Sequence, residues 1–330
     1  MNYLKIRQPE DRRPARICAI GELLLELLPE TPEVLFEEYG RMIKSPSGAA
    51  GIFACAAASL GAEVSLICRL GTDGFSRFVH KAVEQYGVDT SQVTIDQQRQ
   101  IGLAFVEHNR RRNFIYYRKD SAGSTLGPEH VSAEHVSKYQ AVHFPAMLLD
   151  ISASMRDACL RLVNISKERG LLVSIDPNIR RELSRNNSAD MLRQVLRQAD
   201  ILTPSEEEAL YITGKTTVDE AAAALLTLGP QVVAVTCGVQ GAVVYSADTK
   251  VVIPEYPVTP LDNVGAGDVF AAAFLVGLLE GKSLAEAGNF ANTAAALKVR
   301  KQGGIGRGLP TRLEVEQALA QAAAEQAMSQ

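Results

Sequence analysis

The sequence of 330 residues contains no tryptophan, only five cysteines and five histidines, and no run of about 20 apolar residues of the kind that spans a membrane. The first 16 residues are polar, so we expect neither a signal peptide nor a membrane-spanning helix. The cysteines are odd in number and scattered through apolar segments: Cys18, Cys55, Cys68, Cys159 and Cys237. Buried thiols in a reducing cytoplasm are therefore expected, rather than disulfides or a metal site.

The chain also lacks an excess of positive charge. Its 34 Lys and Arg residues stand against 38 Asp and Glu residues, which gives a formal net charge of −4. That balance offers no general attraction to nucleic acid or to an anionic membrane. With 46% hydrophobic and 22% charged residues, the composition is that of a globular protein with one large core. We find no internal repeat and no linker, so we expect one domain over residues 1–330.

Short apolar segments alternate with helical patterns along most of the chain. Buried strands are expected at 16–20, 64–70, 141–144, 171–175 and 232–236, and helices at 47–61, 151–169 and 285–300. This alternation predicts a three-layer α/β domain with a mostly parallel sheet. Gly21 follows the first strand without the further glycines of a dinucleotide-binding turn, which makes a Rossmann dehydrogenase unlikely. His143 is expected in the core.

A second, smaller sheet is expected from a hairpin pattern. Residues 102–108 and 113–118 flank a polar turn, and with residues 31–46 they would cap the main domain, so lid strands are expected at about 23–46 and 100–119. The arginines of the turn, 110–112, lie beside aromatics as in some nucleic-acid sites, but a solvated turn explains them better. Tyr116 and Arg118 share one strand face by period two, and a guanidinium suits a carboxylate.

The most informative stretch is residues 262–270, Asp-Asn-Val-Gly-Ala-Gly-Asp-Val-Phe, followed by an apolar run. It predicts a glycine turn that opens a buried helix, where free N–H groups and the helix dipole favour an anion. Asp268 would stand beside that anion as a base for a hydroxyl that attacks phosphorus. The alternative is that Asp268 is only a helix N-cap.

This stretch resembles the D-T-x-G-A-G-D-x-F signature of the ribokinase-like (PfkB) carbohydrate kinases, with Asn263 where Thr is usual. With further matches, the resemblance extends from about residue 17 to residue 319. It implies a ribokinase-like domain with a small β-sheet lid and ATP-dependent phosphorylation of a sugar hydroxyl. In that family the Gly265, Ala266 and Gly267 amides would form the anion hole and Asp268 would be the base.

The resemblance also implies sites for ATP and Mg²⁺. Residues 205–208 resemble the family's N-x-x-E segment, whose acid, Glu208, would organise magnesium, although a capping box with Ser205 fits the same residues. The nucleotide would lie against the glycine turn after the strand at 232–236 and against the last helices; the candidates are Thr236, Gly238, Gly241 and Asn292. A plain hairpin turn at 237–241 is the competing interpretation. A monovalent cation is left open, and a cytoplasmic homodimer is expected.

The sugar end departs from the family pattern. Residues 47–61 resemble the first signature, G-G-x-x-x-N-x-A…L-G, and keep Gly48, but Ser47 and Ile52 replace a glycine and a substrate-binding asparagine. Glu26 stands where an Asp often holds sugar hydroxyls, one methylene longer. The string Tyr-Tyr-Arg-Lys-x-Ser-Ala-Gly-Ser at 116–124 resembles the lid segment of 2-keto-3-deoxygluconate kinases, in which Tyr116 and Arg118 would contact an acid sugar. Arg180, in the loop 176–180, matches another substrate-binding arginine of those kinases.

These matches predict an ATP-dependent kinase of a keto-sugar acid such as 2-keto-3-deoxygluconate. One alternative is a fructokinase or another PfkB sugar kinase, because a neutral sugar would leave Arg118 without an anionic partner. A further alternative is a non-catalytic sugar or nucleotide sensor, motivated by Glu26, Ser47, Ile52 and Asn263. The joint presence of Gly265, Gly267 and Asp268 argues against a sensor, which has no need of a base beside an anion hole.

Overall fold

The computed structural model describes residues 14–31, 34–108, 112–179, 188–306 and 308–328. Its centre is a nine-stranded sheet in the order β13-β12-β11-β10-β9-β8-β1-β4-β5, which is parallel from β11 to β5 and antiparallel in the pairs β11–β12 and β12–β13. These strands are β1 (Arg16–Ile20), β4 (Glu63–Leu70), β5 (Val93–Ile95), β8 (Ala141–Pro145), β9 (Leu172–Asp176), β10 (Ile201–Leu202), β11 (Val232–Thr236), β12 (Ala242–Ser246) and β13 (Lys250–Ile253). The prediction of a mostly parallel sheet is confirmed.

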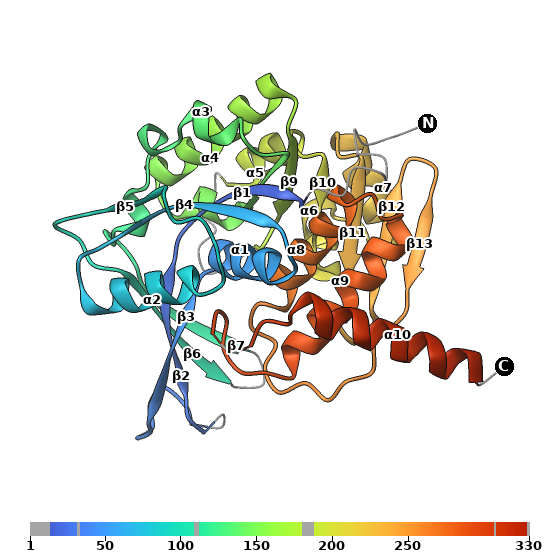
Figure 1. Ribbon diagram of the computed structural model, residues 1–330. Coiled ribbons are helices and arrows are strands. Elements are labelled where there is room, and N and C mark those ends of the chain that lie inside the picture. Colours follow the sequence, from blue (N-terminus) through green and yellow to red (C-terminus); the bar gives the residue numbers. More distant parts are fainter. Residues whose placement is uncertain (1–13, 32–33, 109–111, 180–187, 307, 329–330) are drawn as a thin grey trace.

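Helices cover both faces of this sheet and make the expected three layers (Figure 1). One face carries α1 (Ala49–Ser59), α2 (Gly74–Glu84), α8 (Ala266–Leu279), α9 (Leu284–Val299) and α10 (Arg312–Met328). The other carries α3 (Ala133–Val136), α4 (Ala153–Arg169), α5 (Ser188–Leu196), α6 (Glu206–Thr213) and α7 (Val218–Leu228), with short 3-10 turns η1 (Gly123–Thr125), η2 (Pro128–His130) and η3 (Ala146–Asp150). In β1, Ile17 packs on the first face and Cys18 on the second, because strand side chains alternate.

The smaller sheet projects from the edge of the main body (Figure 1). Its strands are β2 (Leu24–Pro29), β3 (Met42–Ser47), β6 (Gly102–His108) and β7 (Arg112–Tyr117), in the order β3-β2-β6-β7. The β2–β3 and β6–β7 pairs are antiparallel, and the β2–β6 pair is parallel. The prediction of a second, smaller sheet is confirmed, and we call it the lid sheet.

The lid sheet joins the main body where Glu22 is packed among glycines. A Cβ atom at Gly48, whose φ is 113°, would lie 2.4 Å from the Glu22 carbonyl oxygen. A Cβ atom at Gly123 would lie 2.7 Å from Glu22 Cγ. Both distances are shorter than a side chain tolerates, so both lid segments are anchored at places that only glycine fits. This junction, with Glu22 at its centre, is the root of the lid sheet.

The core contains the thiols and the imidazole that the sequence places there. Four of the five cysteines are buried and none forms a disulfide, as expected. His143 is 1% exposed, stacks on Phe53 with ring centroids 3.6 Å apart, and shares a hydrogen bond of 3.0 Å with Ser174 Oγ. Burial lowers the pKa of His143 to about 3. Within the described ranges, no helix combines the length and the apolarity needed to cross a bilayer.

Candidate active site

Two cavities meet at the N-terminus of α8. The polar cavity is bounded by the lid sheet, the end of β9 and the α8 turn, and four carboxylates line it: Glu26, Asp176, Glu208 and Asp268. The apolar cavity lies between the turn after β11 and helix α9, and its lining includes Tyr256, Pro257, Val258 and Phe270. Both cavities are lined by Thr236, Asn263, Ala266 and Gly267. This shared border, the junction, is where groups bound in the two cavities would touch.

The backbone at the start of α8 forms the expected turn. Gly265 is the N-cap, in the left-handed region with a φ of 75°, and Asp268 is the third residue of the helix. The interpretation of Asp268 as the N-cap is therefore wrong. The Ala266 N–H lies 3.3 Å from the Asn263 carbonyl oxygen and closes the turn. The positive end of the helix dipole thus lies at the junction, an arrangement that favours an anion.

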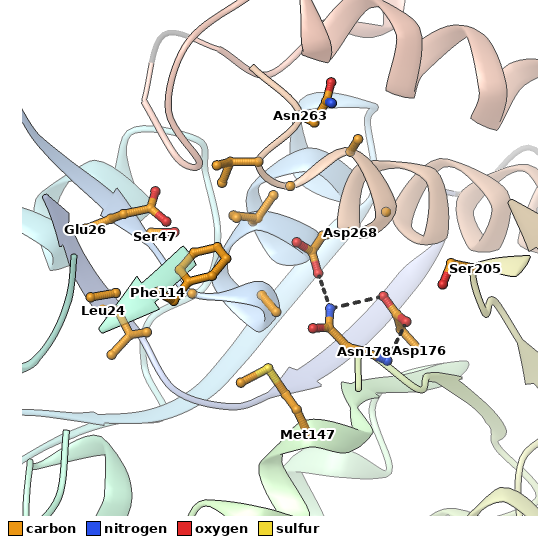
Figure 2. Close-up of a pocket in the computed structure, with 18 of the residues that line it drawn as sticks. Leu24, Glu26, Ser47, Phe114, Met147, Asp176, Asn178, Ser205, Asn263 and Asp268 are labelled. Atoms are coloured by element: carbon orange, nitrogen blue, oxygen red, sulfur yellow. Dashed lines mark hydrogen bonds between the residues drawn. The ribbon is translucent and has the colours of Figure 1, made fainter. Parts of the chain in front are cut away.

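Asp268 belongs to a buried polar cluster at the floor of the polar cavity. Asn178 Nδ2 donates to Asp268 Oδ1 at 3.3 Å and to Asp176 Oδ2 at 3.4 Å, and thereby bridges the two carboxylates (Figure 2). Asn178 holds this position with a φ of 42°, which few residues other than glycine adopt. Burial raises the pKa of the Asp176 carboxyl well above its usual range, and the nearby Glu208 and Asp268 raise it further. The cluster therefore favours an added proton or cation.

Among the described residues, Asn178 Oδ1 and Thr203 Oγ1 are buried polar atoms of the polar cavity without a hydrogen-bond partner. Their residues are 8% and 5% exposed. Buried polar atoms are nearly always satisfied in folded proteins. These two are therefore suited to bind the polar groups of a ligand.

Glu208 has the capping role that the sequence left open as an alternative. Its Oε2 accepts hydrogen bonds from the Ser205 N–H and hydroxyl, both at 2.8 Å, and its Oε1 accepts one from the Ile179 N–H at 2.6 Å. The capping box is confirmed, yet the side chain also lines the polar cavity. No group of three or more His, Cys, Asp and Glu side chains in the described ranges is placed to hold a metal ion. A metal here would need oxygens from a bound ligand as well.

The sugar-side candidates Glu26, Gly48 and Tyr116 line the polar cavity, together with Ser47 and Phe114. Ile52, which replaces the expected asparagine, is 3% exposed. A Cβ atom on Gly265 or on Gly304 would approach Ile52 to 2.9 Å. Ile52 therefore packs between these two glycines and supports the α8 turn. This packing explains why an apolar residue stands at position 52.

Arg118, which the sequence predicts to contact the substrate, forms an ion pair with a carboxylate of the chain itself. Its Nη1 donates to Glu22 Oε2 at 3.1 Å, and its guanidinium lies 4.4 Å from the centre of the Tyr116 ring. Glu22 also accepts from Ser121 Oγ at 3.2 Å, and the Arg118 side chain is only 7% exposed. Arg118 lines neither cavity. It stabilises the root of the lid sheet, whereas Tyr116 does reach the polar cavity.

The nucleotide candidates gather around the apolar cavity. Thr236, Gly238, Gly241 and Asn292 all line it, and Asn292 Nδ2 donates to the Pro254 carbonyl oxygen at 2.9 Å. The glycines belong to the hairpin between β11 and β12, built on the 3-10 turn η4 (Gly238–Gln240), so the hairpin interpretation is confirmed as local structure. Arg180 lies outside the described residues.

Reasoning from the sequence did not nominate Asp176, Asn178 or Thr203. Asp176 is the last residue of β9, Asn178 lies two residues beyond it, and Thr203 directly follows β10. All three lie at the carboxyl edge of the sheet, where open α/β sheets place ligands. That rule, applied to polar residues after each strand, is the signal that could have found them. Phe114 and Met147 also line the polar cavity, and no local pattern in the sequence marks them.

Comparisons with known proteins agree with this geometry. The sequence model of the family described as pfkB family carbohydrate kinase matches residues 14–312. The chain is 33% identical over 315 residues to fructokinase-1 of Oryza sativa subsp. japonica, covering 92% of this chain and 97% of that protein. An Escherichia coli structure described as a candidate ribokinase II with ATP and Mg²⁺ has a TM-score of 0.87 and 32% identity, covering 93% and 99%. A Vibrio cholerae O395 fructokinase with fructose, ADP and calcium has a TM-score of 0.82 and 25% identity, covering 92% and 99%.

Proposed function

The chain belongs to the pfkB family of carbohydrate kinases, and we propose that it transfers the terminal phosphoryl group of ATP to a hydroxyl of a neutral ketohexose such as fructose. The observation that carries the choice of substrate is the charge of the polar cavity. Four carboxylates line it, and its described lining includes no Arg or Lys. An anionic sugar would meet repulsion there, whereas the hydroxyls of a neutral sugar are good donors to carboxylates.

ATP would occupy the apolar cavity and the junction. Its base would lie among the apolar side chains and the turn near Gly238 and Gly241, with Asn292 at the border. Its terminal phosphates would then reach the amides of the α8 turn, because Ala266 and Gly267 belong to both cavities. The structure of a relative from Escherichia coli in complex with ATP and Mg²⁺ supports ATP as the nucleotide.

Asp268 would act as the base. Its carboxylate lies in the polar cavity directly after the amides that would hold the phosphoryl group. A sugar hydroxyl between Asp268 and the junction would lose its proton to the carboxylate as its oxygen attacks phosphorus and the bond to the leaving ADP oxygen breaks. The α8 amides would stabilise the charge on the transferred group without reorganising.

Magnesium fits the donor set at the floor of the polar cavity, which consists of carboxylate oxygens around a site that favours added positive charge. Glu208 would hold it together with phosphate oxygens of ATP, and the ion would neutralise phosphate charge. Glu208 Oε2 already accepts two hydrogen bonds in the capping box, whereas Oε1 accepts only the one from the Ile179 N–H, so Oε1 is the oxygen with acceptor capacity left for the ion.

A keto-sugar acid is the second candidate, for a specific reason. Arg118 Nη2 is buried without a partner among the described residues, and the ring of Tyr116, which Arg118 contacts, lines the polar cavity. A small movement of the lid sheet would bring this donor closer to a carboxylate. The ion pair with Glu22 opposes that role, because it already neutralises the guanidinium.

The test is ADP release with ATP and Mg²⁺ over fructose, ribose, 2-keto-3-deoxygluconate, its galacto epimer and a nucleoside, with Asp268→Asn as the control. We expect turnover with fructose that disappears in the control. Turnover confined to the keto-deoxy acids would show that the substrate is a sugar acid and not a neutral sugar, and would still support the kinase activity. ATP binding without turnover of any compound would favour a sensor.

A further inference from the structure

Lys298, near the end of α9, is completely buried. Its exposed fraction is 0%, and its Nζ donates to the carbonyl oxygen of Asp262 at 3.1 Å. Lysine is almost never fully buried without a compensating partner, because moving an ammonium group out of water is costly. A methionine would fill the same space at no such cost. The ammonium charge itself therefore calls for an explanation.

The environment of Lys298 is the segment that leads into the α8 turn. Asp262 is 4% exposed; its Oδ1 accepts from the Val264 N–H at 2.9 Å, and its Oδ2 accepts from the Gly303 N–H at 2.8 Å. The N–H groups of residues 261 and 262 both donate to the Val299 carbonyl oxygen, at 2.7 and 3.0 Å. A buried cation and a buried carboxylate thus tie together the entry to the turn, the end of α9 and the loop at 301–304.

The position of the charge relative to the turn has a consequence for the bound anion. In a peptide unit the N–H and C=O groups point in opposite directions, so a loop that presents its N–H groups to an anion turns carbonyl groups towards the opposite side. A cation on that opposite side stabilises the orientation. Lys298 supplies one at the Asp262 carbonyl, which belongs to the peptide unit that leads into Asn263, so the charge acts at the entry to the turn, three residues before Gly265.

We propose that the Lys298 ammonium group is the resident cation of the α8 turn: a positioning residue that holds the turn in its phosphate-binding conformation, so that the kinase needs no monovalent metal ion. This inference rests on the proposed role of the Gly265–Gly267 amides. Because the cation is covalently part of α9, it is present at every ionic composition. A free potassium ion at this place would have to displace it.

The first experiment uses the wild-type protein. ADP release is measured with Mg²⁺ and the preferred sugar in KCl, NH₄Cl, NaCl or N-methyl-D-glucamine chloride at equal ionic strength. The four rates are expected to agree within about twofold. Activation by potassium of about tenfold or more, which would show that a site for the ion is available and needed, overturns the proposal.

The second experiment removes the ammonium in two ways. Lys298→Ala leaves space for a small cation, whereas Lys298→Met fills that space with an apolar chain. Both are expected to lose about 10- to 100-fold in kcat, as is typical when a supporting contact of a binding group is removed. Potassium and ammonium, which have similar radii, should restore activity in the alanine variant but not in the methionine variant. Recovery in neither, while both melt like the wild type, contradicts the proposal.

Lys301→Met is the matched control, because Lys301 is three residues away, half-exposed and paired with Glu314 at 3.2 Å. It should keep the wild-type rate and its indifference to potassium. ADP binding by calorimetry, with and without potassium, gives a readout that needs no sugar. If no sugar is phosphorylated but ADP binds equally well in all salts, the substrate assignment fails while Lys298 keeps its role. If ADP binding by the wild type requires potassium, the proposed role of Lys298 is wrong.

Discussion

The two ends of the polar cavity are formed by different parts of the chain. At the phosphoryl end, backbone amides and Asp268 come from α8, whose residues from 268 to 279 are all buried. At the sugar end, side chains come from the lid sheet, whose outer residues are exposed, Tyr117 by 65% and Ile115 by 40%. The first end is fixed by packing, since α1 and α9 enclose α8. The second end can exchange side chains without disturbing that packing, and Glu26 and Ser47 depart from the family's signatures there. Asn263 and Ile52 depart from them at the phosphoryl end, where Ile52 packs against Gly265.

The largest effect is expected at the phosphoryl end. Asp268→Asn should lower kcat by about 1,000-fold, within the range for loss of a general base, while ATP binding changes little. The thermal midpoint should not fall, because one of three neighbouring carboxylates, two of them buried, becomes neutral. Steady-state kinetics and a thermal melt measure both. A variant that keeps more than a tenth of the wild-type kcat would assign the base to another group.

A substitution at the root of the lid sheet should lower the free energy of unfolding. Arg118→Met leaves the buried Glu22 carboxylate uncompensated, which typically costs about 3 to 5 kcal/mol. Combining it with Glu22→Gln should recover most of the loss, as measured by urea unfolding. If Arg118 only supports the lid sheet, the double variant also recovers its turnover of sugar. A persistent loss confined to sugar acids would instead place Arg118 in recognition.

Two identical substitutions within α8 separate activity from stability. The nearest atom to a Cβ on Gly267 is Asp176 Oδ2 at 4.0 Å, so Gly267→Ala should fold as well as the wild type. Its methyl group would lie at the junction, where kcat should fall by about 100-fold. Gly277→Ala should show the reverse, since its Cβ would crowd Ala287 at 3.2 Å and lower the thermal midpoint with kcat retained. Equal kinetic losses in both would contradict the division between the two ends.

The shared core beneath both ends should carry a dependence on pH. The folded pKa of His143, about 3, lies far below the usual value of about 6.5, so protons bind the unfolded chain more tightly. The contribution of neutral His143 to stability is therefore complete above pH 6.5 and is lost as the pH falls towards 3. At pH 5 the loss amounts to about 2 kcal/mol. The change in unfolding free energy between pH 7.5 and pH 5 should be smaller by that amount in His143→Gln. An unchanged difference would mean that His143 is protonated in the folded protein.

The smallest effect is expected from the sugar end. Glu26→Gln should raise the KM for the sugar by about tenfold and leave kcat nearly unchanged, because a hydrogen bond to a charged acceptor becomes one to a neutral amide. The KM for ATP is the internal control. A loss in kcat equal to the loss in kcat/KM would move Glu26 into the reaction itself.

The fold and the phosphoryl end were largely predictable because their signals are local. The sequence of residues 262–270 predicts a glycine turn and the start of a buried helix, and the structure has both. The alternation of strands and helices likewise predicted the sheet. The partner of Arg118 was not predictable in this way, because Glu22 lies 96 residues away along the chain and only the packing at the root of the lid sheet brings the two together. Asn178 was missed for a similar reason, since it bridges to Asp268 across 90 residues.

The root of the lid sheet also bears on protein engineering. Both lid segments enter and leave the main body beside glycines packed against Glu22. In the part of the chain that the structure describes, the four lid strands pair with one another and with no strand of the large sheet. Residues 22–48 and 102–123 therefore form a cassette with two defined seams. Transplanting that cassette from another kinase of this fold, with its own pair in place of Glu22 and Arg118, is a rational way to exchange sugar preference while the phosphoryl-transfer machinery stays untouched.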